Sequence, residues 1–217
     1  MRLLTSPDPK LSTRQVSIAA ENIAAAQFAL CGFDVLEQAR RARFFYDLGV
    51  AKSGGMIKVS VHGSLHGFWD LVDPYLPKNS LKGARADYHR AIDQWLERHS
   101  TSVVCCLVKF ESSDLAGMPR MYLASAAEVA DKLHQSTEEL GDTALYEQYE
   151  LTDAAGRHSV ETLPAHWRFS QARIAELMAG QSGSLEAFRY RFSDAPRCVS
   201  CAAEQPASCV HCLPMMN

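Results

Sequence analysis

A long apolar segment lies in the middle of the chain. Residues 101–110 read TSVVCCLVKF, and positions 103–108 carry only Val, Cys and Leu. A strand without polar alternation is buried on both of its faces. Such a strand requires a sheet that helices cover on each side, so this segment predicts a layered α/β domain.

The flanking segments supply the helices and the other strands. Helical patterns are expected over residues 17–31, 85–99, 125–135 and 169–178. Extended patterns are expected over residues 33–40, 43–51, 56–63 and 121–125, and a Lys-Ser-Gly-Gly turn at 52–55 favours an antiparallel hairpin. The order helix, three strands, helix, strand, strand, helix predicts an αβββαβ core with a mixed central sheet flanked by helices.

The length of the chain indicates one sizeable domain and an appendage. The chain has 217 residues. We expect a flexible leader over residues 1–14, an α/β domain over 15–180, a linker over 181–197 and a Cys-rich tail over 198–217. No stretch approaches the ~18 uninterrupted apolar residues of a membrane span, and residues 1–10 lack the apolar core of a signal peptide. We therefore expect a soluble, cytoplasmic protein with no membrane partner.

The charge balance excludes a non-specific nucleic-acid coat. The chain carries 22 Lys and Arg against 25 Asp and Glu, a net charge of −3. Any anion-binding surface must therefore be a local patch. The candidate patch lies around the second strand, with Arg40, Arg41 and Arg43 before it and Lys52 after it. A solvated surface with interspersed acidic residues is the alternative.

Four cysteines cluster near the C-terminus in the pattern C-x2-C-x7-C-x2-C. They are Cys198, Cys201, Cys209 and Cys212, and without an export signal disulfides are the weaker explanation. Four thiolates can hold Zn²⁺ tetrahedrally, so we expect a small zinc knuckle. The spacer is shorter than that of a zinc ribbon, His211 could replace one cysteine, and free or redox-active thiols remain the alternative.

Two carboxylates occupy positions where a polar side chain is costly. Glu21 lies on an otherwise apolar stripe of the first helix, and Asp47 lies inside an aromatic-rich strand. Two such carboxylates can share Mg²⁺ or Mn²⁺, and an amine such as Lys58 can stabilise charge on a phosphate. Glu21 could instead pair with an Arg, and Lys58 could be an ordinary edge-strand charge.

Four segments together resemble the PD-(D/E)XK nuclease superfamily, which includes archaeal Holliday-junction resolvases and many restriction enzymes. They read SIAAENIAAAQFALCGFDV, FFYDLGVA, MIKVSV and MYLASAAEVADKL, within about residues 15–135. The resemblance implies a restriction-endonuclease-like fold, and metal-dependent hydrolysis of phosphodiester bonds in nucleic acid. We expect DNA rather than RNA, and resolvase-like relatives suggest a homodimer.

In that family a helix-1 Glu, a strand-2 Asp and a strand-3 triplet of Glu or Gln, any residue, then Lys form the metal site. Glu21 and Asp47 would take the first two positions. Residues 58–60, Lys-Val-Ser, fall where the triplet belongs, so the first triplet position is Lys58 and the last is Ser60. Either the lysine has moved two residues along the same strand face, or the site has lost its catalytic amine.

The leading hypothesis is a nuclease-like domain with Glu21 and Asp47 holding the metal, Lys58 stabilising the phosphate and Ser60 positioning water. The opposing hypothesis is an inactive module of the same fold that binds nucleic acid or a partner protein. A third is a zinc-dependent interaction factor that uses the tail and the acidic run at residues 138–150. His62 and His66 could supply metal ligands or a general base, although most such histidines are solvated loop residues.

Overall fold

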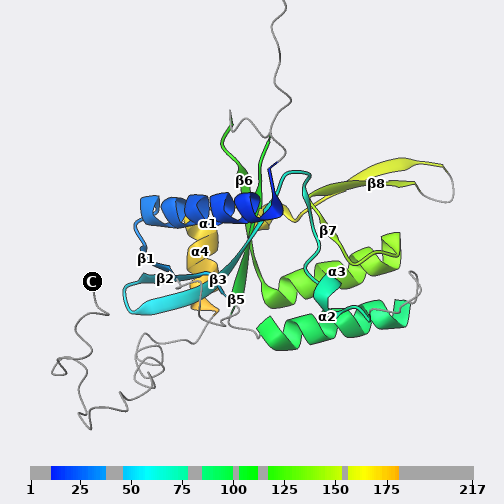
Figure 1. The fold of residues 1–217 in the computed structure, drawn as a ribbon, viewed down its shortest axis with the longest axis horizontal. Helices are drawn as coiled ribbons and strands as arrows, with labels where there is room; N and C mark the ends of the chain where they lie inside the picture. The colour runs from blue at the N-terminus through cyan, green and yellow to red at the C-terminus, as the bar shows by residue number, and fades with distance from the viewer. Residues whose placement is uncertain are drawn as a thin grey trace, which may run out of the picture.

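The fold is built on one five-stranded mixed sheet. The computed structural model describes residues 11–37, 46–77, 85–99, 103–111, 117–152 and 156–180. The strands are β1 (Asp34–Glu37), β2 (Leu48–Lys52), β3 (Gly55–Ser64), β5 (Val103–Lys109) and β6 (Arg120–Ser125), in the order β1-β2-β3-β5-β6. The β3–β5 pair is parallel and the other three pairs are antiparallel. Figure 1 labels the five strands. The expected mixed sheet is confirmed.

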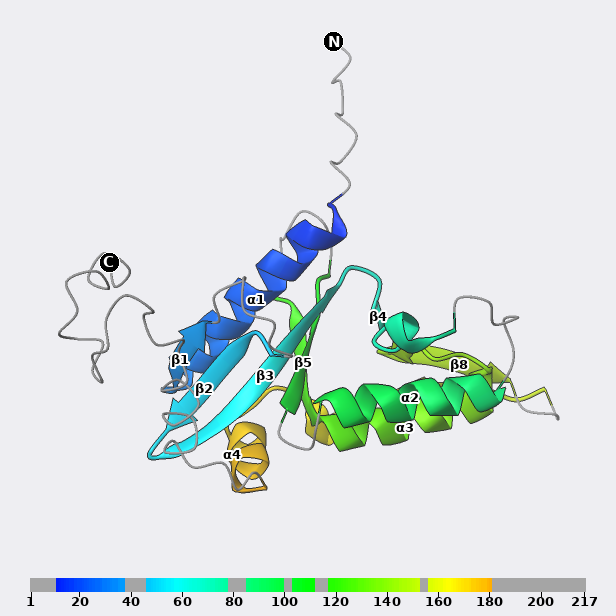
Figure 2. The ribbon, with the colours of Figure 1, turned by 60° about the horizontal axis from the view of Figure 1, so that its bottom comes forward.

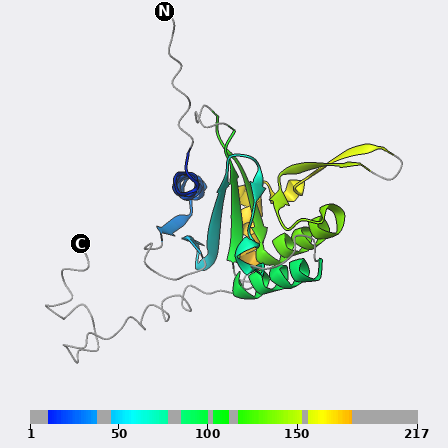
Figure 3. The same cartoon turned by 45° about the vertical axis from the view of Figure 1, so that its right-hand side comes forward.

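Helices cover both faces of this sheet. They are α1 (Thr13–Leu30), α2 (Arg85–His99), α3 (Ala126–Leu140) and α4 (Gln171–Ala179). Figure 2 and Figure 3 show α1 on one side of the sheet and the α2–α3 pair on the other. Residues of α4 join those of α1 in one core, and residues of α2 and α3 form a second core.

Strand β5 divides these two cores. Cys106 and Val108 pack in the core under α1, whereas Cys105 and Leu107 pack in the core under α2 and α3. All four side chains are fully buried. Burial raises the pKa of the Cys105 thiol to about 12, so this thiol stays protonated and acts as an apolar side chain. The strand expected to be buried on both faces is therefore confirmed.

Side-chain caps determine where two of the helices begin. The Ser12 hydroxyl accepts the N–H of Gln15 and the Gln15 side chain accepts the Ser12 N–H, so α1 begins at Thr13, inside the expected leader. The same capping box joins Ser125 and Glu128 at the start of α3, as the sequence predicts. Capping residues lie before the periodic part of a helix, which explains why the pattern placed the start of α1 too late.

The connections add short strands around the sheet. β4 (Phe68–Trp69) pairs with β7 (Leu145–Tyr146), and β8 (Gln148–Thr152) pairs with β9 (His158–Thr162) in a projecting hairpin visible in Figure 1. Two 3-10 turns complete the described elements, η1 (Asp73–Tyr75) and η2 (Ala165–Trp167). Between the strand expected over residues 56–63 and the helix expected over 85–99, the chain extends β3 to Ser64 and adds β4 and η1.

Some expectations fall on residues outside the described ranges. These are most of the leader, the linker and zinc knuckle over residues 181–217, and the basic residues Arg40, Arg41 and Arg43. Among the helices that the structure describes, none combines the length and apolarity needed to cross a membrane.

Candidate functional site

The candidate site lies where β2 and β3 separate. β2 begins at Leu48, opposite Val59, whereas β3 continues to Ser64. The N–H of Asp47 donates to the Val59 carbonyl at 2.8 Å, and the N–H of Val61 donates to Asp47 Oδ2 at 2.7 Å. The Asp47 side chain therefore pairs with the edge of β3 at the point where the neighbouring strand begins.

The Asp47 carboxylate lies in an environment that disfavours its charge. Burial raises the pKa of Asp47 above its ordinary value, the Val61 hydrogen bond partly opposes this, and the charge of Glu21 raises the pKa further. A hydrogen bond with the Ser60 side chain again favours the ionised form. A cation beside this carboxylate would remove the electrostatic cost.

Ser60 of β3 hydrogen-bonds to Asp47, and His62 in turn contacts Ser60. They lie two residues apart on one strand face, and Ser60 Oγ is 3.1 Å from His62 Nε2. Burial and, to a smaller extent, the charge of His99 lower the pKa of His62 to about 4. His62 is therefore neutral at pH 7, with one ring nitrogen as an N–H donor and the other as an acceptor, and it adds no positive charge.

The backbone around His62 is also held in place. The indole N–H of Trp69 donates to the His62 carbonyl at 2.9 Å. The extended pattern expected over residues 56–63 includes His62, and the structure confirms it as part of β3. There it pairs in parallel with Leu107 on β5.

Glu21 approaches the site from α1. Its carboxylate accepts the Ser17 hydroxyl at 3.1 Å, and its charge acts on Asp47. The side chain is half-buried. The structure therefore brings together the two carboxylates that the sequence singled out, from different elements.

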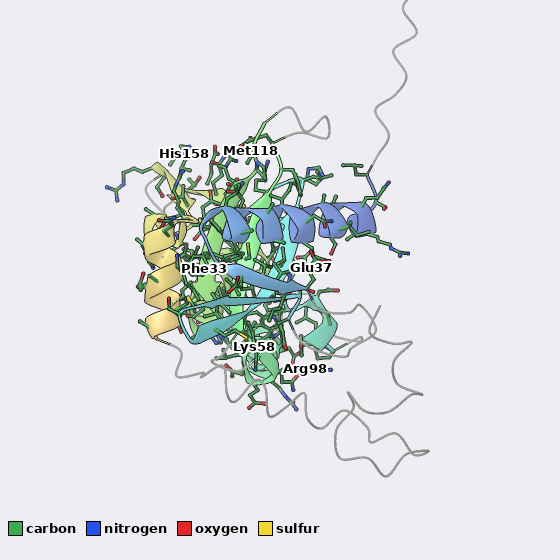
Figure 4. All side chains as sticks on the ribbon, turned by 90° about the vertical axis from the view of Figure 1, so that its left-hand side faces the viewer. Phe33, Glu37, Lys58, Arg98, Met118 and His158 are labelled. Carbon is green, nitrogen blue, oxygen red and sulfur yellow. The ribbon has the colours of Figure 1, made fainter. Side chains whose placement is uncertain are left out.

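Lys58 lies farther along β3, toward the β2–β3 turn. It pairs with Gly49, and its ammonium lies over the Tyr46 ring, 5.7 Å from the ring centre. In Figure 4, Lys58 lies on the side of the strands toward Arg98 of α2, away from α1. Lys58 and Ser60, the two ends of the expected triplet, share one face of β3, and Ser60 hydrogen-bonds to Asp47.

Lys52 does not belong to this cluster. It is the last residue of β2, at the opposite end of the strand from Asp47, and its ammonium lies over the Phe33 ring, 4.8 Å from its centre. Of the expected basic patch, Lys52 is the member that the structure describes. Any contact that it makes with a phosphate would therefore be remote from the carboxylates.

The donor set suits a hard cation held in part by its substrate. Within the described ranges no three or more His, Cys, Asp and Glu side chains are arranged to enclose a metal ion. Mg²⁺ is commonly bound by only one or two carboxylates, with water and phosphate oxygens as its other ligands. Glu21 and Asp47 fit that requirement.

A pocket of about 530 Å³ opens beside the site. It lies between the first turns of α1 and the segment from β3 through β4, and His62 and Ser17 are among its lining residues. Ser17 is the partner of Glu21, and His62 is the partner of Ser60. Two residues that line the pocket, Ser17 and His62, are therefore hydrogen-bonded to two residues of the candidate site, Glu21 and Ser60.

Comparisons with known proteins give little that is specific. No family model and no curated protein matches the chain. Among solved structures, a bacterial homing endonuclease superposes with a TM-score of 0.40 and 17% sequence identity, over 78% of this chain and 96% of that chain. These comparisons assign the chain to no family.

Proposed function

We propose that the protein binds nucleic acid through a PD-(D/E)XK-like domain and hydrolyses phosphodiester bonds with Mg²⁺ or Mn²⁺. The observation that carries this proposal is the position of Asp47. Its carboxylate accepts the Val61 N–H of β3 just before β2 begins, and the charge of Glu21 raises its pKa. The sequence resemblance independently selects the same two carboxylates. DNA is the proposed nucleic acid, and a cytoplasmic homodimer the proposed form.

Each residue of the cluster has a proposed task. Glu21 and Asp47 bind the metal ion, which would neutralise charge on the phosphate and activate a water molecule. Ser60 lies between Asp47 and His62, where its hydroxyl can orient that water. Lys58 is proposed to stabilise charge on the phosphate, because His62 on the same strand face is neutral at pH 7. Arg40, Arg41, Arg43 and Lys52 are proposed to contact the nucleic-acid backbone.

A cleavage assay tests this proposal. Purified protein is incubated with duplex, single-stranded and branched DNA and with RNA, in Mg²⁺, Mn²⁺ or a chelator. Asp47→Asn and Glu21→Gln should each abolish cleavage, because each removes a charged metal ligand. Asp34→Asn, which neutralises an exposed carboxylate on β1, is the matched control and should cut at the wild-type rate. Cleavage that survives chelation or Asp47→Asn would refute the assignment.

A binding module without catalysis is the second candidate. The observation that favours it is that Ser60 stands at the last triplet position, where the family has a lysine, and that its neighbour His62 is neutral. Phosphoryl chemistry depends on stabilising charge that develops on the phosphate, and a neutral imidazole does not supply it. Nucleic-acid binding without metal-dependent product, by folded protein on every substrate, would establish this candidate.

Zinc in the C-terminal tail is a separate proposal. Cys198, Cys201, Cys209 and Cys212 are its proposed ligands, on the strength of their spacing alone. Elemental analysis of the full chain should give about one zinc per chain, and Cys198→Ser with Cys201→Ser should remove it. If the variant loses association with a partner protein but still binds nucleic acid, the tail is an interaction element.

A further inference from the structure

The pocket beside His62 contains an aromatic platform that the proposed chemistry does not use. Phe68 is 40% exposed although it is large and apolar. Its ring lies parallel to that of His66, with an interplanar angle of 16° and centroids 6.3 Å apart. Both residues line the pocket, so a ligand that enters it meets these two aromatic rings.

The turn that carries these rings is held rigidly. The Ser64 hydroxyl accepts three backbone N–H groups, from His66, Gly67 and Phe68, at 3.0–3.2 Å. Gly67 adopts a φ of +76°, which favours glycine, and its carbonyl accepts the N–H of Glu147 at 2.7 Å. Fixing the turn before a ligand arrives lowers the entropic cost of binding on these rings.

The charges around the pocket disfavour a phosphate inside it. The described lining residues include no Lys or Arg. Asp70 is among them, and its pKa is raised first by burial and then by the charges of Asp142 and Asp73. A site with acidic neighbours and no cationic side chain repels an anion, but a carboxylate can accept hydrogen bonds from the amino group of a base.

We infer that this pocket holds one unpaired nucleobase of the bound nucleic acid, stacked on Phe68, while the adjoining phosphodiester lies at Asp47. The inference rests on the proposed function and adds a substrate class to it, namely nucleic acid with an unpaired nucleotide next to the cleavage position. Its basis is the position of His62, which lines the pocket together with Phe68 and also contacts Ser60. Ser60 in turn hydrogen-bonds to Asp47. A pocket of this volume accommodates a ligand the size of a base.

The test uses the full-length protein and a DNA duplex with one extrahelical 2-aminopurine, whose fluorescence reports stacking. The comparison substrates are the fully paired duplex and the same duplex with an abasic residue at that position. Affinities are measured in a chelator, so that no cleavage occurs. The extrahelical base should bind about tenfold tighter than either comparison substrate, since stacking of a base on an aromatic side chain contributes roughly 5- to 150-fold in affinity.

Matched variants localise the effect. Phe68→Leu keeps the apolar volume but removes the ring, and should lower affinity for the extrahelical base by about tenfold. Phe68→Tyr keeps the ring and should bind as the wild type does. Val160→Ala alters another exposed apolar residue, on β9 and 61% exposed, and should change nothing. Circular dichroism of each variant shows that it is folded.

The outcomes separate this inference from the proposed function. Asp47-dependent cleavage with equal affinity for abasic and extrahelical substrates would overturn the pocket assignment and leave the nuclease intact. Base discrimination that depends on Phe68, without cleavage in any metal, would support the pocket in a binding module. Free nucleoside monophosphates that bind as tightly as the extrahelical substrate would show a nucleotide effector site instead. Absence of any nucleic-acid binding would overturn both.

Discussion

The carboxylate of Asp47 forms a backbone-like hydrogen bond with Val61. Asp47 Oδ2 accepts the Val61 N–H at 2.7 Å, two residues along β3 from the Val59 carbonyl that accepts the Asp47 N–H. The side chain thus satisfies a donor on a strand edge that β2 leaves open. Asp47 is therefore both a candidate metal ligand and a structural residue, and a substitution there tests two properties at once.

Replacement of Asp47 should separate these two roles. Asp47→Ala removes the acceptor and leaves the N–H of the buried Val61 unpaired, which should lower the free energy of unfolding by about 1–3 kcal/mol. Asp47→Asn keeps a carbonyl oxygen and removes a desolvated charge, so its stability should lie within about 1 kcal/mol of the wild type. Urea denaturation at pH 7 measures both, and equal stability of the two variants would contradict the structural role.

Sequence patterns predicted the layers of the fold but not the contacts of the site. The apolar run of β5 identified the central strand, because a strand buried on both faces has consecutive apolar residues instead of alternating polar and apolar ones. The proximity of Glu21 and Asp47 followed from the family resemblance. The neighbours of Asp47 on β3 depend on where β2 starts, which is set by pairing between distant segments. Ser60, which the sequence singled out, hydrogen-bonds to Asp47, whereas the Val61 N–H that donates to the Asp47 carboxylate could not be foreseen.

His62 should make the protein less stable in mild acid. Its pKa is about 4 in the folded protein and about 6.5 in an unfolded chain. Between these values the unfolded chain binds more protons, so stability falls as the pH decreases from about 6.5 toward 4. From pH 7 to pH 5 the loss attributable to His62 should be about 2 kcal/mol.

A His62→Asn variant isolates this contribution. Asn cannot take up a proton, so the variant should lose less stability than the wild type between pH 7 and pH 5. Asp47 titrates in both proteins, and its contribution cancels in the difference. Urea denaturation at the two pH values provides the measurement, and parallel pH profiles would show that His62 is not held neutral by burial.

Gly63 is required for the close approach of α1 to β3. A Cβ atom at this position would lie 2.8 Å from Ala20 Cβ and 2.9 Å from the Val16 carbonyl oxygen. Because a backbone oxygen cannot rotate away, Gly63→Ala should push α1 off the sheet and destabilise the protein by about 1–3 kcal/mol. Gly117→Ala, where the nearest atom would be 3.6 Å away, is the control. A thermal melting temperature for Gly63→Ala equal to that of the control would refute the tight contact.

A buried ion pair fixes α4 against α3. Arg173 is 3% exposed, its Nη2 lies 2.6 Å from both carboxylate oxygens of Glu128, and its Nε donates to the Leu123 carbonyl at 3.1 Å. Glu128 also accepts the N–H of Ser125 in the α3 capping box. Arg173→Met keeps the apolar stem but leaves Glu128 and the Leu123 carbonyl without this donor. We expect a loss of about 2–3 kcal/mol, below the range for fully buried pairs because Glu128 is partly exposed.

The pH dependence of this pair has a definite sign. Burial alone would raise the pKa of Glu128, but the hydrogen bonds from Arg173 and Ser125 outweigh it and hold the pKa below its ordinary value. The pair therefore contributes its full stability above the unfolded pKa, and this contribution is lost as the pH falls through the lower folded pKa. Below about pH 4.5 the difference in the free energy of unfolding between the wild type and Arg173→Met should shrink.

Glu176→Gln, which removes the 65%-exposed second partner of Arg173, should lower the free energy of unfolding by less than about 0.5 kcal/mol. A larger loss from Glu176→Gln than from Arg173→Met, in guanidinium denaturation at pH 7, would place the stabilising contact at the surface instead.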